Sequence, residues 1–105
     1  MEIKDLKRLA RYNPEKMAKI PVFQSERMLY DLYALLPGQA QKVQVHEGSD
    51  RVYCALEGEV VVRVGEGGAL LAPGMAAFAP AGAPHGVRNE SASPALLLVV
   101  TAPRP

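Results

Sequence analysis

The stretch GMAAFAPAGAPHGVRN, residues 74–89, decides the fold. It places a short apolar run and a second, mixed run on either side of a connection that contains Pro80 and Pro84. Short runs bounded by Gly and Pro are typical of β-strands joined by tight turns. The stretch therefore predicts strands at residues 76–79 and 85–89, linked by a loop whose prolines restrict its conformation.

The same pattern extends along most of the chain. Turn residues such as Gly, Pro, Asp and Asn recur at short intervals between residues 20 and 101, and no helical periodicity interrupts them. Many short strands at even spacing indicate a β-sandwich or barrel. Parallel strands need long crossover connections, so the predicted sheet is antiparallel. The expected strands are residues 27–36, 40–46, 51–56, 59–64, 69–71, 76–79, 85–89 and 95–101.

The N-terminal residues follow a different pattern. Apolar residues recur at helical spacing over residues 2–12, with charges between them, which predicts a short amphipathic helix. Asn13 followed by Pro14 is typical of a helix N-terminus and predicts a second helical turn. We therefore expect one domain of 105 residues, with a helical segment at 1–20 and a β-barrel at 21–105.

Composition narrows the classes of partner. Apolar residues make up 49% of the chain and charged residues 22%, which is typical of a globular protein rather than a disordered one. The net charge of +1, without a dense basic run, argues against nucleic acid as a partner. No apolar stretch approaches the ~20 residues of a membrane-spanning helix, so we expect no membrane partner. The charged N-terminus and the single cysteine favour a cytoplasmic protein.

Two of the expected strands are apolar on both faces. Residues 28–36 are nearly continuous in apolar side chains, and residues 95–100 are entirely so. A strand with one face in water alternates between apolar and polar residues, so something must cover the second face of these two. The N-terminal segment or a second copy of the chain could do so, and we expect a homodimer through this sheet.

Five residues of the opening stretch resemble the second motif of the cupin superfamily. That motif consists of Gly, five residues, Pro, one residue, Gly, two residues, His, three residues and Asn. All five positions are occupied at this spacing in the present sequence. They are Gly74, Pro80, Gly82, His85 and Asn89.

The first cupin motif is kept in part, on residues 38–58, with a glycine at each end. The family has His, one residue, His, three or four residues and Glu inside this frame. His46 stands at the second histidine, but Gln44 stands at the first. Arg51 stands at the glutamate, with Asp50 one residue earlier. The sequence is thus similar to a small single-domain cupin that departs from the family at two of four ligand positions.

The resemblance implies an antiparallel double-stranded β-helix, the cupin jelly-roll barrel, with a metal site in its mouth. In the family that metal is a divalent transition metal, usually iron, manganese, zinc, copper or nickel, held by three histidines and one glutamate. The resemblance makes His46, His85, Gln44 and Asp50 the candidate metal ligands here. It also implies a small-molecule ligand bound at this site.

The spacing of these residues can be examined without the family. Gln44 and His46 are two residues apart on one strand and share a face, and Arg51 begins the returning strand. A guanidinium at the metal position would repel a dication, whereas Asp50 could replace it through a bulge. Three interpretations follow: a metal site, a structural pair of histidines, or a pocket in which Arg51 pairs with a carboxylate or phosphate of the ligand.

Two further residues lie close in sequence to Arg51. Tyr53 shares its face and could offer a hydroxyl for orientation or proton transfer, or could be a core tyrosine. Cys54 points the other way, and between strand residues we expect a buried, inert thiol.

The sequence leaves two functions open. In the first, the chain is a small cupin that binds a divalent transition metal and acts on, or binds, a small polar metabolite. Arg51 and Tyr53 are then the candidate catalytic residues. In the second, it is a non-catalytic metabolite-binding or accessory cupin with an incomplete metal site. A role in biosynthesis suits either, and the sequence does not decide whether the chain is an enzyme.

Overall fold

The computed structural model describes all 105 residues, with one short helix and nine β-strands. The helix α1 covers Leu6–Leu9. No helix in the chain is both long and apolar enough to cross a bilayer. The strands are β1 (Ala18–Gln24), β2 (Leu29–Leu35), β3 (Ala40–Gln44), β4 (Asp50–Glu57), β5 (Val60–Val64), β6 (Gly67–Leu71), β7 (Ala76–Ala79), β8 (His85–Arg88) and β9 (Ala95–Ala102).

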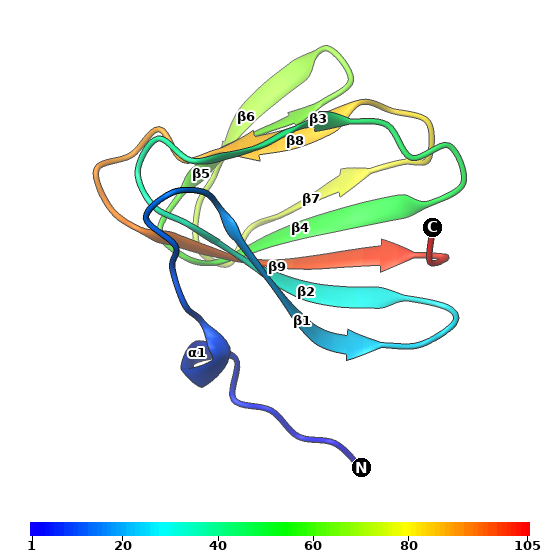
Figure 1. Ribbon diagram of the computed structural model, residues 1–105. Helices are drawn as coiled ribbons and strands as arrows, with labels where there is room; N and C mark the ends of the chain where they lie inside the picture. The colour runs from blue at the N-terminus through cyan, green and yellow to red at the C-terminus, as the bar shows by residue number, and fades with distance from the viewer.

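The strands form two antiparallel sheets that face each other as two layers (Figure 1). One sheet has five strands in the order β1-β2-β9-β4-β7, and the other has four in the order β3-β8-β5-β6. The predicted all-β, antiparallel fold is confirmed. The two hydrogen-bonded ladders remain separate, so the closed barrel of the sequence-based prediction is a two-sheet jelly roll here.

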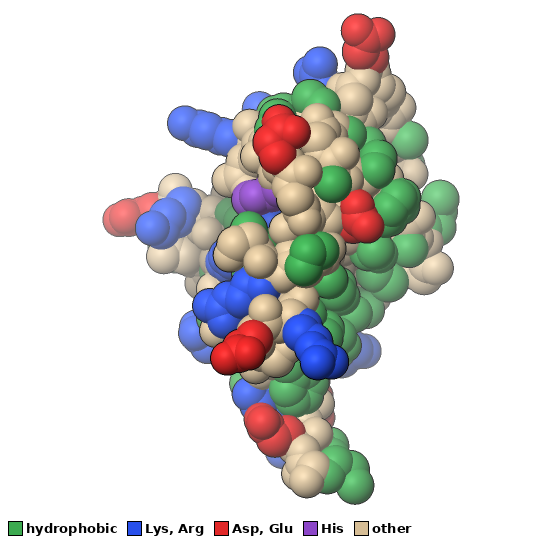
Figure 2. Space-filling model, turned by 90° about the vertical axis from the view of Figure 1, so that its right-hand side faces the viewer, with side chains coloured by type: hydrophobic (Ala, Val, Ile, Leu, Met, Phe, Trp, Pro, Cys, Tyr) green, Lys and Arg blue, Asp and Glu red, His purple; other side chains and the backbone are tan.

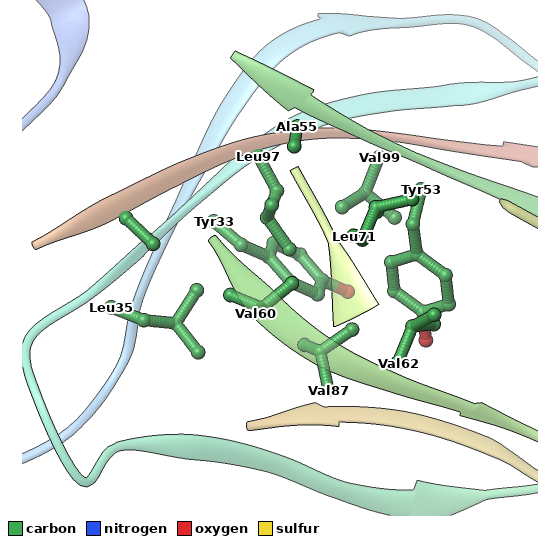
Figure 3. Packing of buried hydrophobic residues seen from close by; sticks show 11 residues of the cluster. Tyr33, Leu35, Tyr53, Ala55, Val60, Val62, Leu71, Val87, Leu97 and Val99 are labelled. Carbon is green, nitrogen blue, oxygen red and sulfur yellow. The ribbon is translucent and has the colours of Figure 1, made fainter. Parts of the chain in front are cut away.

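The main hydrophobic core fills the space between the sheets. Alternate residues of β2, β4 and β9 point inward from one layer and meet residues of β5 and β8 from the other. Figure 3 shows these side chains, with the rings of Tyr33 and Tyr53 among aliphatic neighbours. Both tyrosines are at most 1% exposed, so their hydroxyl groups need partners inside the protein.

The N-terminal segment differs from the prediction. The helix spans four residues instead of 2–12, no second helical turn follows Pro14, and residues 18–24 form β1. A segment this short is a marginal helix by itself, so packing decides its shape. Leu6, Leu9 and the residues around them lie against the outer face of the five-stranded sheet, where Leu32 and Leu96 are buried. The chain itself therefore covers part of the second apolar face (Figure 1).

The opening stretch of the sequence forms β7, β8 and their connection, as predicted. Gly82 has φ +84, which side-chain-bearing residues rarely adopt, and its N–H donates to the carbonyl of His46 at 2.9 Å. At the far end of β8, Asn89 is fully buried. Its Nδ2 donates to the carbonyls of Leu35 at 2.9 Å and Ser93 at 2.8 Å. Asn89 thus joins the end of β2 to the β8–β9 loop.

Replacing this asparagine tests that structural role. We expect Asn89→Ala to lower the free energy of unfolding by about 2–3 kcal/mol, because the buried carbonyl of Leu35 and the part-buried carbonyl of Ser93 lose their donor. Urea denaturation measures the loss. Asn13→Ala, which removes one exposed hydrogen bond to the N–H of Glu15, is the control and should cost less than about 1 kcal/mol. Equal losses in the two variants would contradict the role of Asn89.

Candidate functional site

The two histidines of the chain lie together at one end of the space between the sheets. His85 begins β8 and is 1% exposed, whereas His46, just after β3, is half-buried. Their rings are stacked, with centroids 5.3 Å apart and planes 24° apart. The ring of Tyr53 lies 6.2 Å from that of His85, centroid to centroid. In Figure 2 a histidine reaches the surface close to lysine and arginine side chains.

A bulge in β3 shapes this end of the pocket. Gln41 pairs with Val87 and Gln44 with His85, so three residues of β3 advance against two of β8. The bulge lets Gln41 and Gln44 take part in one hydrogen-bond network despite their odd spacing. A side chain at Gly86 would meet the carbonyl oxygen of Gln41 at 2.9 Å, so the bulged strand needs glycine opposite it.

Gln41 is the centre of that network. The Tyr53 hydroxyl donates to Gln41 Oε1 at 2.7 Å. Gln41 Nε2 donates to the Tyr33 hydroxyl at 3.3 Å and to Gln44 Oε1 at 3.4 Å. Burial is the main cause that raises the pKa of Tyr53, to about 12. The Tyr53 proton is therefore held at neutral pH and is already donated within the protein.

Arg51 points inward from β4 and is 4% exposed. Its Nε donates to Thr101 Oγ1 at 3.1 Å, and its Nη2 lies 3.5 Å from His46 Nε2. Its Nη1 is buried and has no hydrogen-bond partner. No carboxylate forms an ion pair with the guanidinium within 4.0 Å, although it lies near the two tyrosine hydroxyls. A charge that arginine cannot lose is therefore buried without a paired anion.

One carboxylate is buried nearby. Asp31, on the inner face of β2, is 2% exposed, and its Oδ1 has no hydrogen-bond partner. Its Oδ2 lies 4.0 Å from Nζ of Lys19. Burial raises the pKa of Asp31, and the charges of Lys19 and Arg51 oppose that rise. The buried charges here are thus one carboxylate and one guanidinium, with the exposed ammonium group of Lys19 beside them.

Both histidines are held in the neutral form. Burial lowers the pKa of His46 and of His85, and the charge of Arg51 lowers both further. His85 Nδ1 lies 3.0 Å from the carbonyl oxygen of Ala83, which can only accept, so Nδ1 carries the proton. His85 Nε2 is then a buried acceptor, and it has no partner.

The structure brings together four of the residues singled out in the sequence: Gln44, His46, Arg51 and His85. His46 Nε2 is 3.3 Å from Gln44 Oε1, which completes the group. Asp50 does not join them. It is exposed, and its Oδ1 accepts from the N–H of Ala81 at 2.8 Å, so the expected replacement of Arg51 by Asp50 does not occur.

Cys54 points away from the pocket, as strand alternation predicts, but it lies half-buried on the outer face of β4. The thiol is therefore half-buried, where the sequence predicted a buried one.

Sequence reasoning missed four residues of this site: Lys19, Asp31, Gln41 and Thr101. Asp31 gives a usable signal, because it is the one charged residue within the apolar run at 28–36. Gln41 could not be placed by alternation, because the β3 bulge shifts the register between it and Gln44. Thr101 joins the site through the pairing of β9 with β4, which are distant in sequence, and Lys19 joins it from β1, which was expected to be helical.

The side chains present do not fit a divalent metal. The two histidines supply imidazole nitrogens and Gln44 a neutral oxygen, but no group of three His, Cys, Asp or Glu residues gathers anywhere in the chain. The guanidinium of Arg51 lies 3.5 Å from His46 Nε2, where a dication bound to that nitrogen would be repelled. Nothing replaces the charge that a carboxylate ligand would supply.

The hollows on the molecule have volumes of about 160 to 360 Å³, and one of them is lined by Gln41 and Gly86. None of them is lined by His46, Arg51 or His85. A ligand at this end must therefore be small, or must displace the half-exposed His46.

Comparison with known proteins identifies the family. The family model described as "Cupin domain" matches residues 31–101, which contain His46, Arg51 and His85. The chain is a cupin. No match is found among curated proteins.

Solved structures of other cupin-fold proteins resemble this cupin over nearly its whole length. TT1209 from Thermus thermophilus is 95% identical, with a TM-score of 0.98 and full coverage of both chains. An RmlC-like cupin from Desulfovibrio desulfuricans is 27% identical, with a TM-score of 0.86 and coverage of 98% of this chain and 97% of that one. A protein from Klebsiella pneumoniae, described as uncharacterized and with a double-stranded β-helix domain, is 23% identical. Its TM-score is 0.90, over 98% of this chain and 90% of that one, and this likeness shows the fold.

Removing the charge of Arg51 tests the electrostatics of the site. We expect Arg51→Gln to raise the pKa of both His46 and His85, because the imidazolium forms no longer face a buried cation. NMR titration of the ring protons measures both values. In the control Lys19→Gln, only the pKa of His46 should rise, because Lys19 acts on His46 and not on His85. Unchanged values in Arg51→Gln would place the guanidinium outside the pocket.

Proposed function

We propose that this cupin binds a small organic anion at the inner end of the jelly roll, without a metal and without catalysing a reaction. The observation that carries the proposal is the Arg51 guanidinium, 4% exposed, with an unpartnered Nη1 and no carboxylate ion-paired to it. A carboxylate or phosphate of the ligand would supply the missing partner.

Energetics favour an anion over an apolar ligand. Leaving one member of a buried ion pair without its partner costs about 3–5 kcal/mol. Asp31 offsets part of the local positive charge, but it lies 4.0 Å from Lys19, so that one carboxylate serves two cations. Arginine also binds carboxylates and phosphates with two parallel hydrogen bonds, which suits an unpartnered Nη1.

The pKa and the hydrogen bonds of the other polar groups favour ligand binding over catalysis. Proton transfer near neutral pH needs a group whose pKa lies close to the working pH. The pKa of Tyr53 is about 12, and its hydroxyl donates to Gln41 at 2.7 Å. His85 Nδ1 is bound to the carbonyl of Ala83. The Tyr53 hydroxyl therefore holds a ligand in place more readily than it transfers a proton, and only His85 Nε2 is free to accept one.

Binding of propionate tests the proposal. We expect propionate to raise the melting temperature of the wild-type protein, since a ligand at one hundred times its Kd stabilises the folded state by about 2.7 kcal/mol. It should also shift the ring signals of His46 and His85. Arg51→Gln should abolish both effects.

The control for this measurement is Arg27→Gln, which removes an exposed arginine at the β1–β2 turn and should leave binding unchanged. Equal binding by wild type and Arg51→Gln would refute the proposal. So would the absence of any ring shift with either propionate or inorganic phosphate.

We also propose that the protein is a homodimer through the part of the five-stranded sheet that the N-terminal segment leaves open. Cross-strand pairing sets apolar side chains side by side on the outer face of β9, β4 and β7. One row holds Phe78, Val52 and Val100, and the next holds Ala76, Cys54 and Leu98. Figure 2 shows hydrophobic side chains gathered along one side of the molecule.

Because these rows hold no charged side chain, the surface that covers them should be apolar as well. A charged partner would find nothing to pair with there, whereas an identical face related by a two-fold axis is apolar wherever this one is. Phe78 is 58% exposed and Met75, just before β7, is 49% exposed, so large side chains are available for contact. Patches of this kind commonly mark interfaces.

Charging the edge of this face tests the homodimer. We expect wild type to sediment as a dimer and Phe78→Glu as a monomer, because the carboxylate would be buried in an apolar interface. Val43→Glu is the control, since Val43 is 51% exposed but lies on β3 of the other sheet. Sedimentation of wild type as a monomer at all concentrations would contradict the proposal.

A further inference from the structure

We infer that the ligand is a hydroxy acid, whose carboxylate pairs with Arg51 and whose hydroxyl donates a hydrogen bond to Nε2 of His85. The inference rests on the proposed anion-binding function and narrows it to a substrate class. It follows from which buried atoms lack a partner: Nη1 of Arg51 is a donor, and Nε2 of His85 is an acceptor.

The chemistry of His85 is fixed by its other nitrogen. Nδ1 must donate to the carbonyl oxygen of Ala83 at 3.0 Å, so the neutral ring offers only a lone pair at Nε2. Burial and the charge of Arg51 lower the pKa of this ring, and together they outweigh the hydrogen bond to Ala83, which raises it. A carboxylate oxygen cannot satisfy Nε2, because both groups are acceptors. The ligand must therefore carry a donor in addition to its anionic group.

The two unpartnered atoms belong to side chains that share the same neighbours. Arg51 Nη2 lies 3.5 Å from His46 Nε2, and the His46 ring stacks on that of His85 with centroids 5.3 Å apart. Both side chains also lie near one ring: the centroid of Tyr53 is 5.9 Å from Arg51 Cζ and 6.2 Å from the centroid of the His85 ring. A ligand whose hydrogen-bond donor is on the carbon next to its carboxylate would fit between side chains that lie this close together.

The positive charge of Arg51 favours a hydroxyl over an ammonium group as the ligand's hydrogen-bond donor. The only side-chain charge that acts on the titration of His85 is that of Arg51, which is positive. An ammonium group at Nε2 would be repelled by it, whereas a neutral hydroxyl would not. Asp31, whose Oδ1 is also without a partner, lies on β2 in the other sheet from His85 and can accept from a second hydroxyl.

Three acids of three carbons test the inference. Lactate, propionate and alanine differ only in carrying a hydroxyl, a hydrogen or an ammonium group beside the carboxylate. We expect lactate to bind wild type at least about tenfold more tightly than propionate, the effect of one good hydrogen bond, and alanine to bind more weakly than lactate. Titrations followed by NMR give the three affinities even when they are weak.

Two variants and one spectroscopic signal assign the hydrogen bond. His85→Phe should equalise lactate and propionate, while the exposed control Arg27→Gln should keep the preference. In wild type, the ¹⁵N signal of His85 Nε2 should shift when lactate binds and much less when propionate binds. This measurement needs no substituted protein. Equal affinities for lactate and propionate, both lost in Arg51→Gln, would overturn the hydroxy-acid inference and leave the anion site intact. Binding of neither acid, or binding unaffected by Arg51→Gln, would overturn both.

Discussion

The burial of one positive charge, that of Arg51, is the constraint on which the polar end of this jelly roll depends. The guanidinium lies on the inner face of β4, where the next inward residues, Tyr53 and Ala55, belong to the hydrophobic core. Burial lowers the pKa of two neighbouring histidines, and the charge of Arg51 lowers both further and also acts on the buried carboxylate of Asp31. The groups that contact the guanidinium, Thr101, His46 and the nearby tyrosine hydroxyls, are all uncharged. A site with a buried guanidinium and no carboxylate paired to it attracts anions and repels dications.

The jelly roll makes such a site possible because its interior has two different ends. One end is closed by aliphatic side chains and by the hydrogen bonds of Asn89, which tie the β8–β9 loop to the end of β2. The other end is lined by Gln41, the histidines and Arg51, which the β3 bulge and the loop around Gly82 bring together. Rigid strands thus hold polar groups that the packed end could not accommodate. The family relationship accounts for this framework, and the residues that depart from the family pattern account for its chemistry.

The turn and strand pattern was sufficient to predict an antiparallel β-fold, and the resemblance to the two cupin motifs was sufficient to predict that His46 and His85 meet. Local alternation also places Arg51 and Tyr53 on one face of β4. What alternation cannot predict is a bulge, and the bulge decides where Gln41 points. It cannot predict long-range pairing either, and that pairing brings Thr101 and Asp31 to the site. Short helical periodicity at the N-terminus misled the prediction, because packing on the sheet, rather than propensity, sets the structure of residues 1–24.

The most direct test of the account is the metal content of protein purified without an affinity tag or added metal, measured by elemental mass spectrometry. The doubly substituted protein Gln44→His with Arg51→Glu, which restores the family's ligand types at these two positions, is the positive control. We predict less than about a tenth of an equivalent of any transition metal in wild type, also after soaking with each metal. The metal content of the control should be much higher. The reason is that the Arg51 guanidinium, 3.5 Å from His46 Nε2, repels a dication bound to that nitrogen. Near-stoichiometric iron, manganese, nickel, copper or zinc in wild type, lost in the double variant His46→Ala with His85→Ala, would contradict the account.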